Sequence, residues 1–393
     1  MRKLGLIWKI LIAIGLAVVI GSTLPLISEK GTVGLVRLMA TFNDIFGGFL
    51  NFVVPLIILG FIAPGIAKLG KGSGKMLGIA TIFAYTSTVF AGIMAYFVAS
   101  NLLPKIMGNV DTSVVGEGRA PLEGLLELEI EPIMGVLTAL VLAFLLGIGM
   151  AAIESKTMYY FFDELQKIVE KVITYAIIPL LPLHIFGIFL NLTHSGQAAK
   201  ILSVFALVFV MIIVLHLVLL TIQYTTAGAM SKRNPIQLMK TMAPAYFTAL
   251  GTQSSAAAIP VTLQQARKTG ASERVTNFTI PLFANIHLSG STITIVSCSI
   301  GVLLLNGMDV NFALYLPFIL MLGVTMIAAP GVPGGAVVAA TGLLASMLGF
   351  SQEMVALMIA LYMAQDSFGT ATNVTGDGAL AVMVDAVANK VTK

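Results

Sequence analysis

Eight mostly apolar stretches recur along this chain, and each is long enough to cross a bilayer. They lie at about 5–26, 46–67, 77–103, 133–153, 158–191, 199–229, 275–305 and 354–388. A helix rises 1.5 Å per residue, so about 20 apolar residues span the roughly 30 Å of bilayer hydrocarbon. Since 58% of the residues are hydrophobic and 10% are charged, we predict an all-α polytopic membrane protein, and a soluble globular domain is excluded.

The first apolar stretch follows two basic residues, Arg2 and Lys3, as it would in a signal peptide. It runs from Leu4 to Leu26, which is longer than the apolar core of a signal peptide, and no small-residue cleavage site with a soluble domain follows it. We therefore interpret it as the first membrane span, with its basic end in the cytoplasm.

Charges between the spans indicate the same orientation. The joins on the cytoplasmic side contain Lys68, Lys71, Lys75, Lys156, Lys167, Lys171, Lys232, Arg233 and Lys240. The opposite joins contain fewer basic residues and an acidic run, namely Glu117, Glu123, Glu127, Glu129 and Glu131. Because Lys and Arg are enriched in cytoplasmic loops, we predict a multi-pass protein of the cell inner (plasma) membrane with both termini in the cytoplasm.

Two segments have centres that do not fit a simple span. The first, about 236–268, contains Gly251–Pro260 (GTQSSAAAIP), and the second, about 312–350, contains Ala328–Gly335 (AAPGVPGG). Such centres break a helix, and non-helical backbone at membrane depth is tolerated only where it is buried in protein or lines a cavity. Each segment is therefore predicted to be a re-entrant helical hairpin whose tip serves a site.

Each predicted hairpin is followed by a full span, at about 275–305 and about 354–388. The flanking charges place the ends of the first hairpin inside and the ends of the second outside, so the two pairs are inverted. Inverted repeats with broken segments are typical of secondary transporters whose binding site lies near the middle of the membrane.

Four polar residues share one face of the last span. Asp366, Thr370, Asn373 and Asp377 are spaced i, i+4, i+7, i+11, which on a helix places them within about 60° of one another and spreads them over roughly 16 Å. A carboxylate inside a bilayer is unfavourable unless paired or hydrated, so it indicates a functional site by default. The alternatives are a structural acid for Asp366 and a capping or packing role for Asn373 and Asp377.

Three short motifs stand at the hairpin tips and in the last span. They are Gln253-Ser254-Ser255 with Pro260 downstream, Gly331–Gly335 (GVPGG) and Asn373–Asp377 (NVTGD). In this order they resemble the dicarboxylate/amino acid:cation symporters, the glutamate transporter family. The resemblance covers nearly the whole chain and implies a bacterial-type member with eight transmembrane helices and two inverted hairpins. It also implies a homotrimer of scaffold domains, each holding a transport domain that moves like an elevator.

The resemblance assigns parts of the chain to these two domains. The scaffold would comprise residues 1–75 (helices 1 and 2) and 104–191 (helices 4 and 5). The transport domain would comprise residues 76–103 (helix 3) and 192–393, with hairpin 1, helix 7, hairpin 2 and helix 8.

The resemblance also implies roles for individual residues. Substrate-binding residues would be Ser254, Ser255, Ser291, Val332, Gly335, Asp366, Gly369, Thr370 and Asn373. Among these, Asp366 would take the substrate ammonium group. Sodium ligands would be Thr86, Ser87, His287, Ser289, Asn373 and Asp377. Sodium is the expected coupling ion, and hard oxygen ligands suit it.

Departures from the family pattern concern both the ions and the substrate. The family motif Asn-Met-Asp-Gly-Thr stands here as His287–Ser291 (HLSGS), so a serine replaces an acidic ligand and fewer sodium ions per cycle are expected. His287 either takes part in proton coupling or fills the space through hydrogen bonds. His184 and His216, on apolar spans, are predicted to be packing residues.

Gly369 stands where carriers of acidic amino acids have an arginine. Gln253 stands at a position of the first hairpin where some relatives have an arginine. An acidic side chain buried without a positive partner carries a desolvation penalty that hydrogen bonds recover poorly. The predicted substrate is therefore a neutral or zwitterionic amino acid, either cystine, as in the cystine-uptake branch, or a small neutral one.

We predict a secondary active symporter, not an enzyme, that couples amino-acid uptake to inward sodium flow. An acidic amino acid or dicarboxylate symporter and a proton-coupled carrier remain alternatives. An aspartyl protease needs two carboxylates that share a proton, whereas Asp366 and Asp377 lie roughly 16 Å apart along one helix. An ion channel is disfavoured because paired hairpins favour alternating access.

No cofactor is expected besides sodium as the coupling ion, and few partners are expected. The single cysteine, Cys298, excludes an internal disulfide framework, and four histidines without cysteine partners exclude a zinc finger. The predicted partners are the amino acid, sodium, the lipid bilayer and two further copies of the chain, with no nucleic acid.

Overall fold

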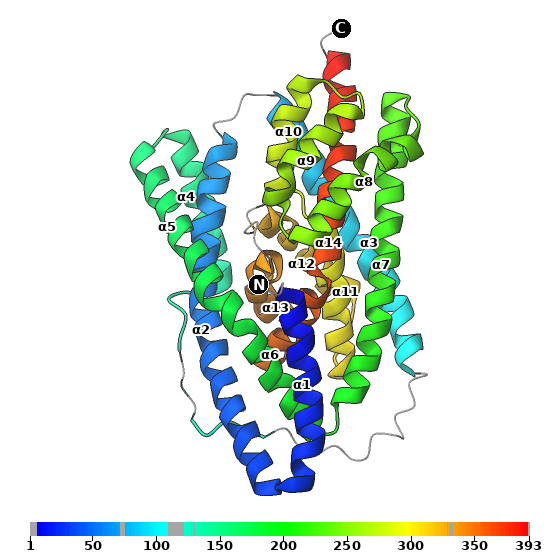
Figure 1. The fold of residues 1–393 in the computed structure, drawn as a ribbon. Helices are drawn as coiled ribbons and strands as arrows, with labels where there is room; N and C mark the ends of the chain where they lie inside the picture. The colour runs from blue at the N-terminus through cyan, green and yellow to red at the C-terminus, as the bar shows by residue number, and fades with distance from the viewer. Residues whose placement is uncertain are drawn as a thin grey trace, which may run out of the picture.

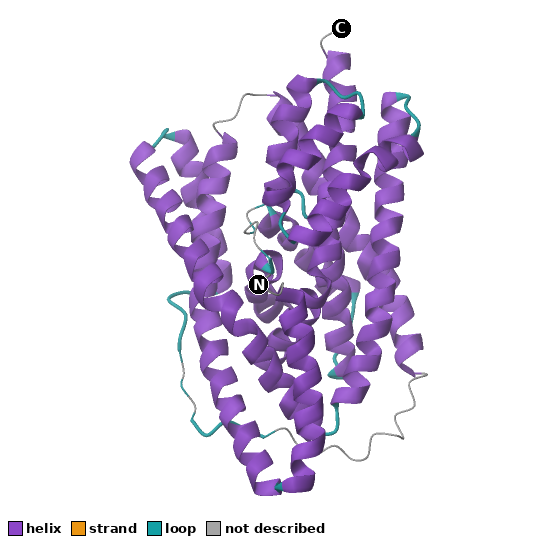
Figure 2. Cartoon of the chain, in the orientation of Figure 1, coloured by secondary structure: helices purple, strands orange, loops and turns teal. Residues whose placement is uncertain are grey.

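The computed structural model describes residues 6–70, 75–108, 122–126, 128, 130–327, 329 and 333–391. Within these residues the regular structure is helical and contains no strand (Figure 2). Most of the long helices run roughly along the long axis of the molecule (Figure 1). The prediction of an all-α chain is therefore confirmed for the described residues.

The helices follow one another with short joins. In chain order they are α1 (Leu6–Ile27), α2 (Glu29–Gly70), α3 (Lys75–Gly108), α4 (Val136–Ala152), α5 (Lys156–Val172), the π-helical turn η2 (Ile173–Ile177), α6 (Ile178–His194), α7 (Ala198–Ser231), α8 (Pro235–Thr252), α9 (Ser255–Lys268), α10 (Glu273–Ile286), α11 (Ser289–Leu305), α12 (Phe312–Met326), α13 (Gly335–Leu348) and α14 (Gln352–Val391).

Seven helical stretches of the described chain are long and apolar enough to cross a membrane. They are Trp8–Ile27, Glu29–Ala67, Met76–Lys105, Lys156–His194, Ile201–Ser231, Glu273–Leu305 and Gln352–Ala388. The predicted span at about 133–153 corresponds to α4, which has 17 residues and covers only about 26 Å. It is shorter than predicted because Gly135, at its N-cap, has extended backbone with φ −65° and ψ 154°.

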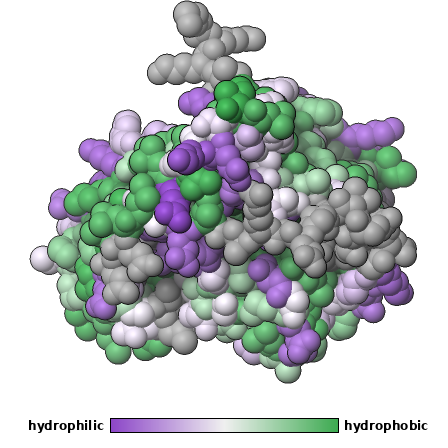
Figure 3. Space-filling model, turned by 90° about the horizontal axis from the view of Figure 1, so that it is seen from below, coloured by the Kyte–Doolittle hydropathy of each residue, from purple (hydrophilic) through white to green (hydrophobic). Residues whose placement is uncertain are grey.

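Apolar side chains occupy much of the outer surface. On α4, Val141, Leu145 and Ile148 are each more than half exposed, and their spacing places them on one face. Trp8 and Val210 are similarly exposed on other helices. At the end of the molecule seen in Figure 3, hydrophilic residues are interspersed among hydrophobic ones. The apolar flanks of the helices suit contact with lipid rather than water.

The helices pack in two groups. In the first, α2 packs against α4, α5 and α6, and α1 packs against α6. In the second, α14 packs against α7, α8, α9, α10 and α11, and α3 packs against α11 and α12. Figure 1 shows α2, α4 and α5 on one side of the molecule and α3, α7 and α8 on the other. Most of α14 is buried, so its polar residues lie inside the protein.

The first predicted hairpin is formed by α8 and α9, which pack against each other. Asn234 caps α8 by accepting hydrogen bonds from the Ile236 and Gln237 amides, and Pro235 occupies the first helical position. Only Gln253 and Ser254 separate the two helices. Gln253 has φ 54°, a left-handed conformation that is uncommon for a residue other than glycine.

The second predicted hairpin is formed by α12 and α13, which also pack together. Asn311 caps α12 by accepting a hydrogen bond from the Leu314 amide. At the start of α13, Gly334 has φ +76° and lies so close to Met363 that a Cβ here would be 2.5 Å from its sulfur. Val332, which we predicted to bind substrate, lies outside the described residues.

The predicted span at about 275–305 is broken in the middle. α10 ends at Ile286 and α11 begins at Ser289, with His287 and Leu288 in extended or irregular conformations. Directly after the break, Gly290 approaches α14 so closely that a Cβ would lie 2.5 Å from the Gly369 carbonyl oxygen. The break therefore places backbone N–H and C=O groups of two helix ends beside the polar face of α14.

Candidate functional site

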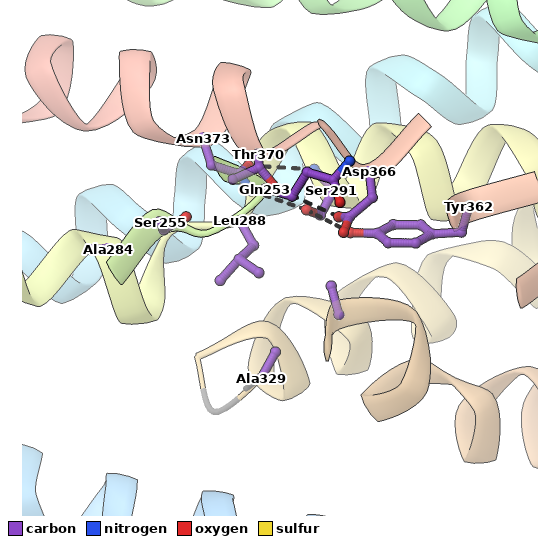
Figure 4. Close-up of a pocket in the computed structure, with 11 residues that line it drawn as sticks. Gln253, Ser255, Ala284, Leu288, Ser291, Ala329, Tyr362, Asp366, Thr370 and Asn373 are labelled. Atoms are coloured by element: carbon purple, nitrogen blue, oxygen red, sulfur yellow. Dashed lines mark hydrogen bonds between the residues drawn. The ribbon is translucent and has the colours of Figure 1, made fainter. Parts of the chain in front are cut away.

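A pocket lies where the two hairpin tips, the α10–α11 break and α14 meet (Figure 4). Its space is about 330 Å³, including the part open to solvent. It is lined by Gln253, Ser255, Ala284, Leu288, Ser291, Ala329, Ala336, Tyr362, Asp366, Thr370 and Asn373. The pocket therefore contains five residues that we predicted to bind substrate.

Asp366 is the charged residue among those that line the pocket. It is 4% exposed. Its Oδ2 accepts a hydrogen bond from the Gly334 amide at 2.7 Å, and its Oδ1 lies 3.5 Å from the Thr370 hydroxyl. Among the described residues, no Lys or Arg lines the pocket, and the donors to the carboxylate are neutral. A carboxylate in this setting is suited to bind a cationic group of a ligand.

Asn373 connects α14 to the broken helix. Its Oδ1 accepts hydrogen bonds from the Gly290 amide at 2.7 Å and the Ser291 amide at 3.3 Å, and its Nδ2 donates to Ser291 Oγ at 3.0 Å. Leu288, at the N-cap of α11, has no side chain that could accept these bonds. Asn373 therefore supplies from another helix the acceptor that an N-cap residue normally provides.

Tyr362 brings a hydroxyl group to the wall of the pocket. It lies one helical turn before Asp366, and its hydroxyl donates to Ser291 Oγ at 3.0 Å. In Figure 4 its ring lies next to Asp366 and Ser291. Tyr362 thus links α14 to Ser291 of α11, the same residue that Asn373 contacts.

A second polar cluster lies outside the pocket lining, and His287 is at its centre. The His287 side chain is buried, with Nδ1 2.8 Å from Asp377 Oδ1 and Nε2 3.0 Å from Ser87 Oγ. Gln223 of α7 donates to Ser87 Oγ at 2.9 Å and lies 3.4 Å from Ser289 Oγ. The cluster therefore connects α3, α7, α14 and both sides of the α10–α11 break.

The residues predicted to bind sodium are only partly brought together. Ser87, His287, Ser289 and Asp377 belong to this cluster, whereas Thr86 is exposed on α3. Among the described residues, no group of three or more His, Cys, Asp or Glu side chains is placed to hold a metal ion. A cation here would rely on hydroxyl, carbonyl and carboxylate oxygens.

Gly369 faces α11 rather than the pocket. A Cβ at this position would lie 3.4 Å from the Ser291 nitrogen and 3.5 Å from its Cα, and Gly369 is not among the lining residues. A small side chain fits there in ordinary contact, but a long one would have to lie along the crossing of α11 and α14. The glycine that the close approach of the two helices requires is therefore Gly290 rather than Gly369.

Two helices begin at the pocket. Ser255 is the first residue of α9, and Ala336 is the second residue of α13. Amides in the first turn of a helix have no partner within the helix, and the helix dipole makes this end partly positive. These two helix ends are therefore favourable positions for an anionic group, whereas Asp366 favours a cationic one.

Sequence reasoning missed three polar residues that shape the site. Tyr362 could have been found, because it continues the spacing of the polar face by one turn before Asp366. Gln223 and His216 lie on a strongly apolar helix, and nothing in the sequence indicates their partners. His216, predicted to be a packing residue, is buried with Nε2 3.0 Å from the Gly290 carbonyl oxygen.

Comparison with known proteins gives two findings. The family described as the sodium:dicarboxylate symporter family matches residues 6–387. A protein named serine/threonine transporter SstT, from Streptococcus suis (strain 05ZYH33), is 27% identical over 357 residues, which cover 85% of this chain and 95% of that protein. Both similarities extend over most of the described helices.

Proposed function

This chain belongs to the sodium:dicarboxylate symporter family, and from that premise we propose that it takes up a neutral amino acid together with sodium. Members of the family are transporters, so the chain is an integral membrane transporter and not an enzyme. The finer points of the proposal are the class of substrate, the residues that bind it and the motion that carries it.

The observation that carries the proposal is a buried carboxylate without a cationic partner in the pocket lining. Asp366 is held by the Gly334 amide and lies beside the Thr370 hydroxyl, and none of the described residues that line the pocket is Lys or Arg. The ammonium group of an amino acid would supply the missing positive charge. Since a charged pair with good hydrogen bonds recovers much of the desolvation penalty, this is the best position for that group.

The carboxylate of the amino acid would bind at the starts of α9 and α13. Ser255 and Ala336 line the pocket there, and Ser254 and Gly335 are the neighbouring predicted contacts. The dipole and the first-turn amides of a helix favour an anion at its N-terminal end. An α-amino acid would then lie between Asp366 and the two hairpin tips, with both of its charged groups matched.

The side chain of the substrate is proposed to be small and uncharged. No positive residue remains in the lining to pair with a second carboxylate, so aspartate and glutamate should bind weakly. The relative from Streptococcus suis is named a serine/threonine transporter, which supports a small neutral amino acid over cystine. A symporter of acidic amino acids or dicarboxylates is the alternative.

Sodium is proposed to bind at the polar cluster, with Asp377 as its carboxylate ligand. The Ser87 and Ser289 hydroxyls belong to the same cluster, and hard oxygen ligands suit sodium. His287 already contacts both Asp377 and Ser87, which leaves fewer oxygen atoms for ions. This supports a small number of sodium ions in each cycle, with a proton-coupled carrier as the alternative.

We further propose an elevator motion of α3 and α7–α14 against a scaffold of α1, α2 and α4–α6. The packing of the helices into these two groups supports the division. Contact between both hairpin tips and one pocket supports gates on either side of a single site. Three copies would associate through their scaffolds, and native mass spectrometry that detected only monomers would contradict the trimer.

Competition between amino acids tests the substrate class. Purified protein in liposomes with an inward sodium gradient would take up labelled serine in the presence of each unlabelled amino acid. We expect small neutral amino acids to compete and aspartate to compete at least roughly tenfold less well, since an unpaired buried charge is strongly unfavourable. Stronger competition by aspartate or by cystine than by serine would contradict the proposed substrate.

A further inference from the structure

The Tyr362 hydroxyl donates to Ser291 Oγ at 3.0 Å. Asp366, one helical turn later on α14, receives its hydrogen bonds from the Gly334 amide and the Thr370 hydroxyl. A phenol donates one hydrogen bond at a time. The hydrogen of the Tyr362 hydroxyl is therefore used by Ser291.

Ser291 Oγ receives two donors in this arrangement. One is the Tyr362 hydroxyl and the other is Asn373 Nδ2, each at 3.0 Å. A hydroxyl oxygen has two lone pairs and one hydrogen, so both lone pairs are then used. Within the described residues, no hydrogen bond uses the hydrogen of the Ser291 hydroxyl. Ser291 lines the pocket, so that hydrogen is available to a ligand.

Both charged groups of a bound amino acid have proposed positions away from Ser291, so only its side chain remains to contact Ser291. The ammonium group goes to Asp366 and the carboxylate to the starts of α9 and α13, as argued above. The side chain is the remaining part. A donor in a buried wall needs an acceptor, because an unpaired buried hydroxyl is unfavourable.

We propose that Tyr362 is a specificity-determining residue that acts through Ser291 to favour amino acids with a hydroxyl group on the side chain. Tyr362 donates to Ser291, and Ser291 then donates to the side-chain oxygen of a substrate whose ammonium group occupies Asp366. The inference rests on the proposed function, because it specifies the side chain of the amino acid that the same pocket binds.

Two pairs of nearly isosteric amino acids test this in liposomes that contain the full chain. Serine differs from 2-aminobutyrate, and threonine from valine, by a hydroxyl in place of a methyl group. The wild-type protein should prefer the hydroxyl compound in each pair by roughly two- to tenfold, the equivalent of one net hydrogen bond. Equal affinities, or a preference for 2-aminobutyrate and valine, would overturn the proposal.

Variants test the part that Tyr362 plays. Tyr362→Phe keeps the ring and should lower the preference for serine over 2-aminobutyrate, raising the KM for serine with little change in maximal rate. Ser291→Ala should remove the preference. Combining the two changes should lower it no further than Ser291→Ala alone, because Tyr362 acts through Ser291.

Tyr224→Phe is the matched control. Tyr224 is also buried, and its hydroxyl donates to the Thr375 carbonyl at 2.6 Å, away from the pocket lining. This variant should keep the wild-type preference. If Tyr362→Phe behaved like Tyr224→Phe, or if the effects of Tyr362→Phe and Ser291→Ala added, the inference would be wrong. Failure to take up any neutral amino acid would instead contradict the proposed function.

Discussion

Asp366 links a hairpin tip to the last long helix through one carboxylate oxygen. We expect Asp366→Asn to keep the fold, because the amide oxygen of Asn can still accept the hydrogen bond from Gly334. It should lose the charge that pairs with the substrate ammonium. Truncating one partner of such a pair costs about 2–5 kcal/mol, which weakens binding roughly 30-fold or more. Serine binding to purified protein, followed by calorimetry, measures this loss.

Asp163→Asn is the matched control for that substitution. Asp163 lies on α5 and pairs with Lys167 at 2.6 Å at the surface, and exposed ion pairs contribute little to stability. Serine binding to this variant should match that of the wild-type protein. Wild-type affinity in a folded Asp366→Asn variant would show that the ammonium group binds elsewhere.

The sequence predicted which residues share a face of one helix, but it did not predict which residues of other helices contact them. The spacing of Asp366, Thr370 and Asn373 predicted a shared face, and all three line the pocket. Capping of α11 by Asn373 was not predictable as such, because it depends on where α11 begins. The same holds for Gln223, whose contact with Ser87 joins residues 136 positions apart.

At the scale of helices, the crossing of α11 and α14 depends on glycine. A Cβ at Gly290 would lie 2.5 Å from the Gly369 carbonyl oxygen and 2.7 Å from Thr372 Cβ. We expect Gly290→Ala to force the helices apart, at a cost of about 1–3 kcal/mol. The apparent melting temperature in detergent should fall by several degrees, and serine affinity should fall with it because Ser291 is displaced.

Gly15→Ala provides the comparison for a helix-interior glycine. No atom lies within 4 Å of a Cβ built at Gly15 of α1, and alanine favours a helix over glycine by about 1 kcal/mol. This variant should melt at the same temperature as the wild-type protein or higher. A Gly290→Ala variant that melts like Gly15→Ala would contradict the close crossing.

Helix boundaries followed from the sequence where a strong local signal was present. The Gly- and Pro-rich centres at Gly251–Pro260 and Ala328–Gly335 predicted interruptions, and α8–α9 and α12–α13 are separate helices there. The break at His287 and Leu288 carries no proline, so local propensity did not indicate it. It is stabilised by Asn373 and His216 from other helices, which only the tertiary structure brings together.

At the scale of the molecule, the buried course of α14 organises the site. The helix contacts most members of one packing group, so Asp366 and Asp377 are enclosed by protein rather than by lipid. Composition predicted the membrane class, because apolar spans alone require a bilayer or a very large core. The way in which the two helix groups pack depends on contacts between distant segments, and apolar patterning does not specify these.

The central claim is that sodium drives amino-acid uptake through the Asp366 pocket. Its most direct test is concentrative serine uptake into liposomes at a clamped membrane potential, with sodium or choline outside. We expect serine to accumulate above its external concentration only with an inward sodium gradient, and Asp377→Asn to need more sodium for half-maximal uptake. Equal accumulation with choline, or accumulation driven by a proton gradient alone, would contradict the account.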